Sequence, residues 1–368
     1  MSDLFDRLRL NFRYAFDPRK PLLTLRLAKA VLQSYIFKKP PLRYVDFAID
    51  FACNLRCEHC FATALQNPGR PKMKVEDYQS VAEQAMQMGA VNFSFQGGEP
   101  LLFKNLPDII HAVKPDRNVI SVTTNGTLLT TENVRVLKKT GVNILTISLD
   151  SAIAAEHDSF RGAPGTFEKT VAGIHLAMQE GLRVTLGTVV THQSIHSEGI
   201  QKLIELAKEW KVLLYIILPV PAGRWTDNTD MFLTKEDLTY IDDLTSRSPY
   251  IRTDFQANFG PNGCGAVKEI LYLTPYGDVL SCPFIHISLG NIFKDTLRNI
   301  RQKALEIPWF SHYHQECLAS TDKIFIRDHL SKTFNVPGLP LPLEEAFPNG
   351  EARLTGNDSN HQSTGNKT

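Results

Sequence analysis

Three cysteines that could hold a metal or a metal cluster lie within eight residues, at Cys53, Cys57 and Cys60. They follow directly on an apolar, strand-like run, so one short loop can turn all three sulfur atoms toward a common centre. A closed structural zinc site needs four ligands, and His59, between two of the cysteines, is poorly placed to be the fourth. A cubane iron–sulfur cluster with three cysteine ligands leaves one iron open for another molecule. The spacing therefore favours a cluster over zinc.

The other three cysteines, Cys264, Cys282 and Cys317, form a second and more widely spaced group. An even number of cysteines can indicate disulfides, but disulfide frameworks are typical of small secreted proteins. This chain has 368 residues, and its first residues carry charges rather than the apolar run of a secretory leader. In such a protein, clustered cysteines are more often metal ligands or catalytic groups. The structural alternative is that they are buried apolar residues that hold nothing.

Glycine-rich and polar motifs that could bind a ligand follow other strand-like runs. Residues 96–100, Gln-Gly-Gly-Glu-Pro, contain two glycines, which let the backbone approach a ligand closely, and a carboxylate that can accept hydrogen bonds from an ammonium group. Ser148 and Asp150 follow a later run, and Arg161 could hold a carboxylate with two parallel hydrogen bonds. The structural alternatives are a tight turn for 96–100, helix capping for Ser148 and Asp150, and a surface ion pair for Arg161.

Strand-like and helix-like runs alternate from Tyr44 onward, and they must position these motifs. Apolar and β-branched residues predict six strands, at 44–51, 91–96, 118–124, 143–149, 183–190 and 212–219. Amphipathic runs between them predict helices, near 75–89, 104–113, 131–140, 166–180 and 197–210. Gly89, Gly141 and Gly181 come just after three of these helices, where glycine commonly ends a helix.

This alternation predicts a parallel sheet with right-handed crossovers. Such sheets bind their ligands at the C-terminal ends of the strands, which is where the cysteine triad and the polar motifs fall. We therefore expect an α/β fold, a partial parallel (β/α)6 barrel, followed by a small domain around the second cysteine group. A helix near 235–246 and a hairpin-like run at 272–280 lie in that second part.

The first 45 residues are basic, with ten lysines and arginines against three acidic residues. Residues 22–38 predict a helix with Leu23, Leu27 and Ala30 near one side, and the prolines at 40 and 41 stop it. The favoured interpretation is a helix that covers an open edge or the bottom of the barrel. The alternative is contact with a membrane surface or an anionic substrate.

The motifs, taken in order, resemble those of the radical S-adenosylmethionine (SAM) superfamily. The spacing Cys-x3-Cys-x2-Cys after the first strand resembles the signature of that family, and residues 97–100 look like its GGEP motif. Residues 148–150, Ser-Leu-Asp, are similar to a third motif, and residues 157–167, His-Asp-x-x-Arg-Gly-x-x-Gly-x-Phe, resemble one large subgroup. The resemblance covers about residues 44–320 and identifies the chain as a radical SAM enzyme.

The resemblance implies that Cys53, Cys57 and Cys60 ligate a [4Fe–4S] cluster whose open iron binds SAM. In the family, one electron from the reduced cluster cleaves SAM to methionine and a 5′-deoxyadenosyl radical, which abstracts a hydrogen atom from the substrate. The expected electron donor is a low-potential protein of the flavodoxin or ferredoxin type. The residues expected to bind SAM are Gln96, Gly97, Gly98, Glu99, Ser148, Asp150 and Arg161.

The second cysteine group resembles the start of a SPASM or Twitch extension. Cys264 and Cys282 flank Gly277 with the spacing Cys-x12-Gly-x4-Cys of that region, and Cys317 follows. The resemblance implies that these three cysteines hold an auxiliary [4Fe–4S] cluster. Full SPASM regions carry more cysteines, so one auxiliary cluster is the limit, and it is one protein ligand short. The site could stay open, or the fourth ligand could be one of His286, His312, His314 and Asp322.

Composition sets the remaining expectations. With 43% hydrophobic and 21% charged residues the chain is ordinary for a globular protein, and its net charge of +1 gives no field that would attract nucleic acid. No apolar run approaches the roughly 20 residues of a membrane span, so membrane contact is possible but not favoured, and we expect a cytoplasmic protein. The expected divisions are a basic extension, a radical SAM core, an auxiliary region, and a Pro-rich and then disordered tail, at 1–43, 44–222, 223–330 and 331–368.

The expected reaction begins with hydrogen abstraction. An auxiliary cluster could then accept the electron left on the substrate radical, so we expect a net oxidation. Three substrate classes stay open, namely a small metabolite such as a sugar or cyclitol, a ribosomal peptide, and a lipid or isoprenoid, because a fold does not select a substrate. The alternative of another class is a non-catalytic iron–sulfur or zinc protein, which would leave the SAM motifs unexplained.

Overall fold

The structure is a computed structural model that describes residues 9–10, 12–14, 17–35, 41–254 and 263–348. The predicted disordered tail from about residue 348 lies outside these residues, as does the predicted end of the N-terminal helix at 36–38. Among the helices that are described, none has both the length and the apolar character needed to cross a membrane.

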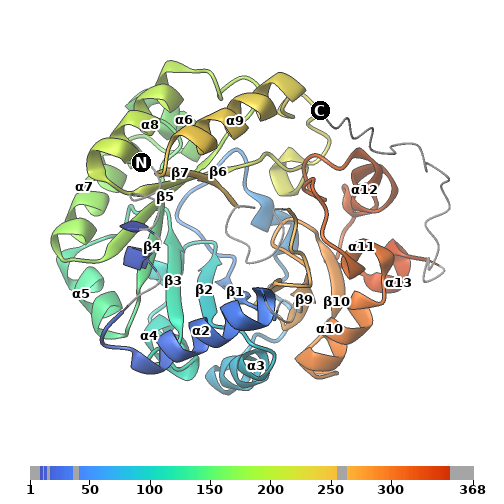
Figure 1. The fold of residues 1–368 in the computed structure, drawn as a ribbon. Helices are drawn as coiled ribbons and strands as arrows, with labels where there is room; N and C mark the ends of the chain where they lie inside the picture. Colours follow the sequence, from blue (N-terminus) through green and yellow to red (C-terminus); the bar gives the residue numbers. More distant parts are fainter. Residues whose placement is uncertain (1–8, 11, 15–16, 36–40, 255–262, 349–368) are drawn as a thin grey trace, which may run out of the picture.

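One curved sheet of eleven strands organises the described chain (Figure 1). Seven consecutive strands are parallel and lie side by side in chain order. They are β1 (Tyr44–Asp50), β2 (Asn92–Gly97), β3 (Val119–Thr124), β4 (Ile144–Ser148), β5 (Arg183–Val189), β6 (Leu213–Ile217) and β7 (Ile251–Thr253). The six predicted strands are therefore present, and the predicted α/β fold with a parallel barrel sheet is confirmed.

The sheet continues beyond β1 into the region of the second cysteine group. β8 (Ile270–Leu273) pairs with β1 in parallel, and β9 (Asp278–Leu280) and β10 (Ile287–Asn291) follow as antiparallel neighbours. β11 (Leu341–Pro342) pairs with β10 and forms the other edge, so the ring stays open between β11 and β7. The sheet thus runs across the predicted divisions at 222 and 330, and those divisions stay predictions.

Helices cover the outer face of the sheet (Figure 1). Between the parallel strands lie α3 (Val75–Gln87), α4 (Leu106–Ala112), α5 (Thr131–Lys139), α6 (Ala154–Arg161), α7 (Thr166–Gln179), α8 (Glu198–Trp210) and α9 (Lys235–Arg247). Only α6 among these had not been predicted. After β10 come α10 (Leu297–Leu305), α11 (Pro308–Ser311), α12 (Lys323–Asp328) and α13 (Leu343–Ala346). Short 3-10 turns complete the chain, among them η1 (Phe61–Leu65), η2 (Pro100–Leu102), η3 (Gly223–Trp225) and η5 (Leu330–Thr333).

The core lies between the sheet and the helices. Successive residues of a strand point to opposite faces, and the helix-facing set of β1 includes Val45 and Phe47, both without exposed surface. The Phe47 ring stacks on Phe93 and Phe95 of β2 and meets Tyr78 of α3 edge-on, with ring centroids 5.2 Å apart. This apolar layer leaves the opposite, inner face of the strands free to carry polar side chains.

The N-terminal helix α2 (Pro21–Tyr35) crosses the N-terminal ends of the strands, the position that the sequence analysis favoured. Lys20 Nζ donates to the carbonyl oxygens of Asn118 and Gly141, each at 3.0 Å, and Arg26 donates to the carbonyl of Ala90. Earlier in the chain, the Tyr14 hydroxyl donates to Val184 O at 2.8 Å. Basic residues of this segment therefore satisfy backbone carbonyls at the bottom of the barrel.

Candidate functional site

A pocket lies at the C-terminal ends of the parallel strands and brings most of the predicted site residues together. Its cavity volume is about 170 Å³, below the roughly 300–1,000 Å³ typical of small-molecule sites. Predicted residues that line it are Cys53, Cys57, Cys60, Gln96, Gly97, Gly98, Ser148 and Arg161. Glu99 and Asp150 do not line the pocket; each lies directly behind it, in contact with residues that do.

The cysteine loop begins where β1 ends. The Asp50 carboxylate accepts hydrogen bonds from the backbone N–H groups of Phe51 and Ala52, at 2.7 and 3.1 Å, which turns the chain sharply out of the strand. Cys53 is exposed, Cys57 is buried, and Cys60 is half-buried at the start of η1. Cys53 is thus the most exposed of the three, and Cys57 is the most buried.

The two glycines of the 96–100 motif fix this loop against β2. A Cβ atom on Gly97 would lie 2.1 Å from Asp50 O, and one on Gly98 would lie 2.0 Å from Ala52 O. Gly98 N donates to Asp50 O at 2.8 Å, and Glu99 N donates to Ala52 O at 2.9 Å. Because glycine has no side chain, these two residues can pack closely against the backbone that leads into Cys53. They also line the pocket.

The Glu99 carboxylate is buried and already carries three hydrogen bonds. Oε1 accepts from the Thr124 hydroxyl at 2.7 Å and from Leu101 N at 3.0 Å, and Oε2 accepts from Asn125 N at 2.8 Å. Burial raises the pKa of Glu99, although these hydrogen bonds favour its charged form. Glu99 therefore joins the end of β3 to the end of β2. Its predicted contact with SAM stays a prediction.

Arg161 reaches the pocket from the C-terminal end of α6. Its Nε donates to Asp150 Oδ2 at 2.6 Å, and its Nη1 lies 3.7 Å from Cys57 Sγ. Burial opposes the charge, but Asp150 and Cys57 hold the pKa of Arg161 above its ordinary value. His157 Nδ1 accepts the backbone N–H of Asp150 at 3.2 Å, and burial lowers the pKa of His157 to about 4. Asp150 is thus a partner of Arg161, and its predicted contact with SAM stays untested.

Other residues of the site were not among those predicted to bind the cluster or SAM. His59 stacks on Phe160 with ring centroids 4.4 Å apart, and Trp225 lies against both rings. Asn125 Nδ2 donates to Asn54 Oδ1 at 2.9 Å, inside the cysteine loop. The sequence signal for Asn125 was its place directly after β3. The aromatic group carried no signal, because its members come from three separate segments.

The chemistry of the cysteine triad suits a metal cluster. Burial raises the pKa of Cys53 to about 11 and also raises the pKa of Cys60. Thiolates therefore do not form readily in this pocket unless a bound cation compensates them, and an iron cluster supplies that charge. Backbone N–H groups also point at the sulfurs, as Leu55 N does at Cys53 Sγ over 3.4 Å. These donors fit cluster-bound thiolates, which accept such hydrogen bonds.

The second cysteine group is also brought together. Cys264 precedes β8, Cys282 follows β9, and Cys317 comes after α11. Burial raises the pKa of Cys264, raises that of Cys282 to about 12 and raises that of Cys317 well above its ordinary value. The Cys264 thiol adds to the shift of Cys282, and both add to the shift of Cys317. A bound cluster would stabilise the thiolates of these three half-buried, neighbouring cysteines.

The predicted candidates for a fourth auxiliary ligand differ in how they are engaged. Asp322 Oδ1 caps α12 by accepting from Ile324 N and Phe325 N, and the His314 ring is 2.7 Å from Trp309 O. His286 is buried, and its Nε2 has no partner. The choice between a fourth protein ligand and an open site stays a prediction.

No three His, Cys, Asp or Glu side chains converge on a point that could hold a single metal ion, within the part of the chain that the structure describes. The four ligands of a structural zinc ion must meet at one centre. Each cysteine of a cubane cluster binds a different iron atom, so its sulfurs stand further apart.

A polar layer lies beneath the pocket on the inner face of the sheet. Gln96, in the pocket floor, donates to Asp46 Oδ2, while Asp46 Oδ1 has no partner. Burial raises the pKa of Asp46 to about 7. Tyr272 stands opposite Asp46 in the β1–β8 register, and its buried hydroxyl has no partner. Sequence patterning did not reveal this pair, because β8 joins β1 from more than 200 residues away.

Comparison with known proteins agrees with this geometry. Residues 51–207 match the family model of the radical SAM superfamily, and residues 264–319 match that of the SPASM iron–sulfur cluster-binding domain. An AdoMet-dependent heme synthase of Methanosarcina barkeri is 31% identical over 296 residues, which cover 71% of this chain and 82% of that protein. The antilisterial bacteriocin subtilosin biosynthesis protein AlbA of Bacillus subtilis is 28% identical over 271 residues, 70% of this chain and 59% of that protein.

Among solved structures, Streptococcus suis SuiB bound to its precursor peptide SuiA shares the fold, with a TM-score of 0.60 and 18% identity over 78% of this chain and 70% of that chain. The family models and the sequence relatives support the same assignment as the motifs at the strand ends. The chain belongs to the radical SAM superfamily and is an enzyme that uses a [4Fe–4S] cluster and SAM, with a SPASM-type iron–sulfur region.

Proposed function

We propose that Cys53, Cys57 and Cys60 ligate the catalytic cluster and that the pocket beside them binds SAM. The observation that carries the proposal is the convergence of the three thiols with Gln96, Gly98, Ser148 and Arg161 on one pocket. When bound, the cluster and SAM supply the 5′-deoxyadenosyl radical that abstracts hydrogen from a substrate. The chain's own residues have to position these groups and exclude water.

The surrounding residues suit that task. Glu99 and the two glycines hold the cysteine loop and the ends of β2 and β3 in one fixed arrangement. Ser148 and Arg161 bring a hydroxyl and a cation to the wall where a carboxylate of SAM would be held. The rings of His59, Phe160 and Trp225 close one side of the pocket with apolar surface.

The second part of the proposal is that Cys264, Cys282 and Cys317 hold one auxiliary cluster that accepts an electron from the substrate radical. The two cysteine regions adjoin, because Phe61, which follows Cys60, meets Phe284 edge-on with ring centroids 5.2 Å apart. The thiols of Cys60 and Cys282 both act, after burial, to raise the pKa of Tyr272. A substrate near Tyr272 would lie between the two sites, and the net reaction would be an oxidation.

A largely buried polar layer lies on the inner face of the sheet, one step below the pocket floor. It includes Ser94, Ser121, Thr146 and Thr185, with the last two hydroxyls 2.9 Å apart, together with Asp46 and Tyr272. Because these residues do not line the pocket, they do not select among the three substrate classes. A relative that takes part in bacteriocin biosynthesis favours a peptide, and a heme synthase among the relatives makes a tetrapyrrole a further candidate.

The electron that starts the reaction would come from a flavodoxin or ferredoxin, which implies a cytoplasmic enzyme. The test uses protein that is purified and reconstituted with iron and sulfide without oxygen, reduced, and supplied with SAM. The measured product is 5′-deoxyadenosine, and Cys57→Ala is the control. Product from the wild type and none from the variant supports the proposed ligation.

Product from Cys57→Ala at the wild-type rate would overturn the assignment of the cysteine triad. If neither protein forms product, SAM binding by the iron-loaded wild type decides the matter. A measurable affinity points to a strict requirement for substrate, whereas absent binding contradicts the proposed SAM pocket.

A further inference from the structure

The contact between Arg161 and Cys57 places a buried cation beside a sulfur that is proposed to bind the cluster. Arg161 Nη1 lies 3.7 Å from Cys57 Sγ, within the range of a hydrogen bond to sulfur, and the guanidinium is 8% exposed. Gly162 follows it with φ of +69°, and a Cβ atom there would lie 2.6 Å from Arg56 O. The end of α6 is therefore packed directly against the cysteine loop, and the charge of Arg161 is held at that sulfur.

The charge balance around Arg161 can be followed residue by residue. Asp150 is the paired anion, with its Oδ2 2.6 Å from Arg161 Nε, and its Oδ1 is 3.4 Å from Val189 N. His157 faces the same pair, but burial lowers its pKa to about 4, so it is neutral near pH 7. One cation and one anion thus dominate the field at Cys57 on this side.

We propose that Arg161 and Asp150 set the reduction potential of the catalytic cluster, with Arg161 raising it and Asp150 lowering it. The inference rests on the proposed ligation by Cys57 and deepens it. In this proposal Arg161 is a positioning residue that changes the cluster potential through the sulfur of Cys57, in addition to any contact with SAM.

The physical reason is that reduction adds one negative charge to the cluster. A cation that donates a hydrogen bond to a ligand sulfur stabilises the reduced form more than the oxidised form, which raises the potential. A nearby anion has the opposite effect. Both interactions are strong here, because the site is buried and water does not screen them.

Arg224 is a matched control for Arg161, because it is a second arginine next to the cysteine loop. It also stands near the cysteine triad, because its backbone N donates to Cys60 O at 3.1 Å and its charge lowers the pKa of Cys60 slightly. Its side chain, however, is exposed and donates to Arg56 O at 3.0 Å. Solvent screens such a charge, so its removal should have little effect on the cluster.

The experiment is a redox titration of the reconstituted holoenzyme without SAM, followed by electron paramagnetic resonance of the reduced catalytic cluster. Cys282→Ala is placed in every protein so that the auxiliary signal does not overlap. The variants are Arg161→Gln, Arg161→Lys, Asp150→Asn and Arg224→Gln. Iron content and circular dichroism check that each one is folded and loaded.

We expect Arg161→Gln to shift the midpoint to more negative potential and Asp150→Asn to shift it to more positive potential. Arg161→Lys keeps the charge without the planar fork and should fall between the wild type and Arg161→Gln. Arg224→Gln should leave the midpoint unchanged. Shifts of opposite sign from two partners of one ion pair would not arise from general damage to the fold.

Equal midpoints in the wild type, Arg161→Gln and Asp150→Asn would overturn the inference, as would shifts of the same sign in both variants. Failure of the proposed function has a different signature. In that case the parent protein with intact Cys57 shows no reducible cluster signal at all, so the two failures are distinguishable. If Arg161→Gln alone cannot be loaded with iron, Asp150→Asn and Arg161→Lys still test the sign.

Discussion

The two cysteine regions each offer three sulfurs, but the chain assembles them in different ways. The first triad lies on one eight-residue loop, and neighbouring strand ends hold that loop through the backbone contacts of Gly97 and Gly98. The second group spans 264–317 and is brought together by the β8–β9 hairpin and the segment after α11. The first lines a pocket, whereas the three cysteines of the second are half-buried and do not line it.

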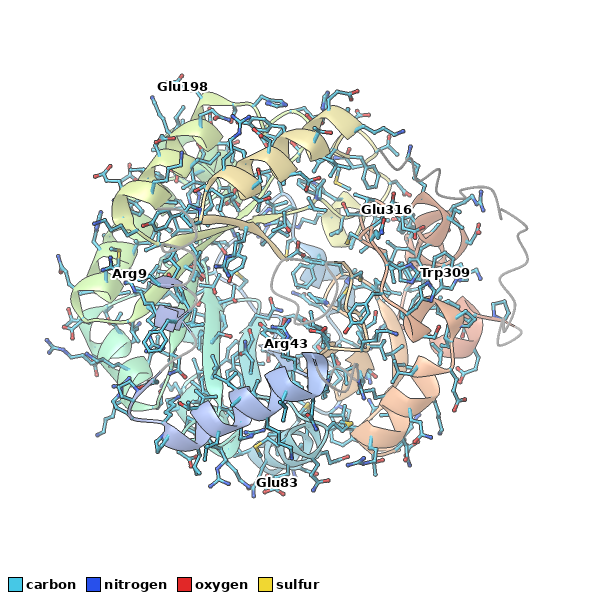
Figure 2. All side chains as sticks on the ribbon, in the orientation of Figure 1. Arg9, Arg43, Glu83, Glu198, Trp309 and Glu316 are labelled. Atoms are coloured by element: carbon cyan, nitrogen blue, oxygen red, sulfur yellow. The ribbon has the colours of Figure 1, made fainter. Side chains whose placement is uncertain are left out.

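This difference separates two tasks. A cluster that must bind SAM needs an accessible face, and the graded exposure of the first triad supplies one. A cluster that only passes electrons is better enclosed, because burial and hydrogen bonds to sulfur govern its potential. Arg43, labelled in Figure 2, ties the regions together through an ion pair with Glu269 at 3.0 Å, both side chains being nearly buried.

The largest expected effect contrasts one cysteine from each region. Cys57→Ala should abolish 5′-deoxyadenosine formation, while Cys282→Ala should keep SAM cleavage and lose only the iron of the auxiliary cluster. The reason is that only the first triad lines the pocket. Iron analysis and 5′-deoxyadenosine assays on both variants check this. Loss of SAM cleavage in both would mean that the two regions do not act separately.

The next effect concerns the glycine support of the first region. Gly98→Ala places a Cβ atom 2.0 Å from Ala52 O, a backbone atom that cannot move aside. We expect a loss of more than about 4 kcal/mol in the free energy of unfolding, together with loss of cluster binding. Gly165→Ala is the matched control, because a Cβ atom there meets nothing within 4 Å and only its φ of +74° opposes the change.

The control should lose about 1–2 kcal/mol and keep its cluster. Thermal unfolding of both reconstituted proteins provides the measurement. Similar unfolding temperatures for the two variants would show that the strand-end contact does not hold the cysteine loop.

We expect the stability of the protein to depend on pH through Asp46, which lies on β1 opposite Tyr272 of β8. Its pKa is about 7 in the folded protein and 3.8 in its ordinary state, so between these values the folded state binds more protons than the unfolded chain. The free energy of unfolding contributed by this group therefore falls as the pH rises from about 4 to about 7. Asp46→Asn removes this loss, which is at most about 4 kcal/mol.

Melting curves at pH 5 and pH 8 check the sign. The variant should gain stability relative to the wild type at both pH values, and the gain should be larger at pH 8 than at pH 5. A difference that is the same at both pH values would contradict a titrating Asp46.

The smallest effect is expected at the aromatic contact between the two regions. Phe61 and Phe284 meet edge-on at 5.2 Å, with 80° between the ring planes. A double-mutant cycle with Phe61→Leu and Phe284→Leu should give a coupling of about 1 kcal/mol in unfolding free energy. Additive effects would indicate that the regions are stabilised independently at this point.

The strands of the barrel were predictable because short runs rich in apolar and β-branched residues alternate with helical patterns. The strand predicted at 44–51 is observed as Tyr44–Asp50, and that at 212–219 as Leu213–Ile217. β7 has three residues, too few for a pattern, and α6 lies within a run that carried motif residues. The pairing of β8 with β1 depends on contacts between distant segments, which no local pattern contains.

Residue type and spacing singled out Cys53, Cys57, Cys60 and Arg161, which line one pocket, while what each of them binds stays a prediction. The role of a residue was not predictable where its partner decides that role. Glu99 accepts from Thr124 and from two backbone N–H groups, and Asp150 is the partner of Arg161. Asp46 belongs to no sequence motif. Its role follows from its position on the inner face of β1 and from its hydrogen bond with Gln96, which only the structure shows.

The contacts that Tyr14 makes at the bottom of the barrel affect how the chain folds while it is being synthesised. The Tyr14 hydroxyl meets Val184 O and Leu213 N, and the latter lies 199 residues further along the chain. At roughly 5–20 residues per second, a ribosome needs roughly 10–40 s to make that stretch. During this time the segment around Tyr14 lacks its contact with Leu213. Its docking is therefore one of the last steps of folding, and a nascent chain halted before β6 would still expose it.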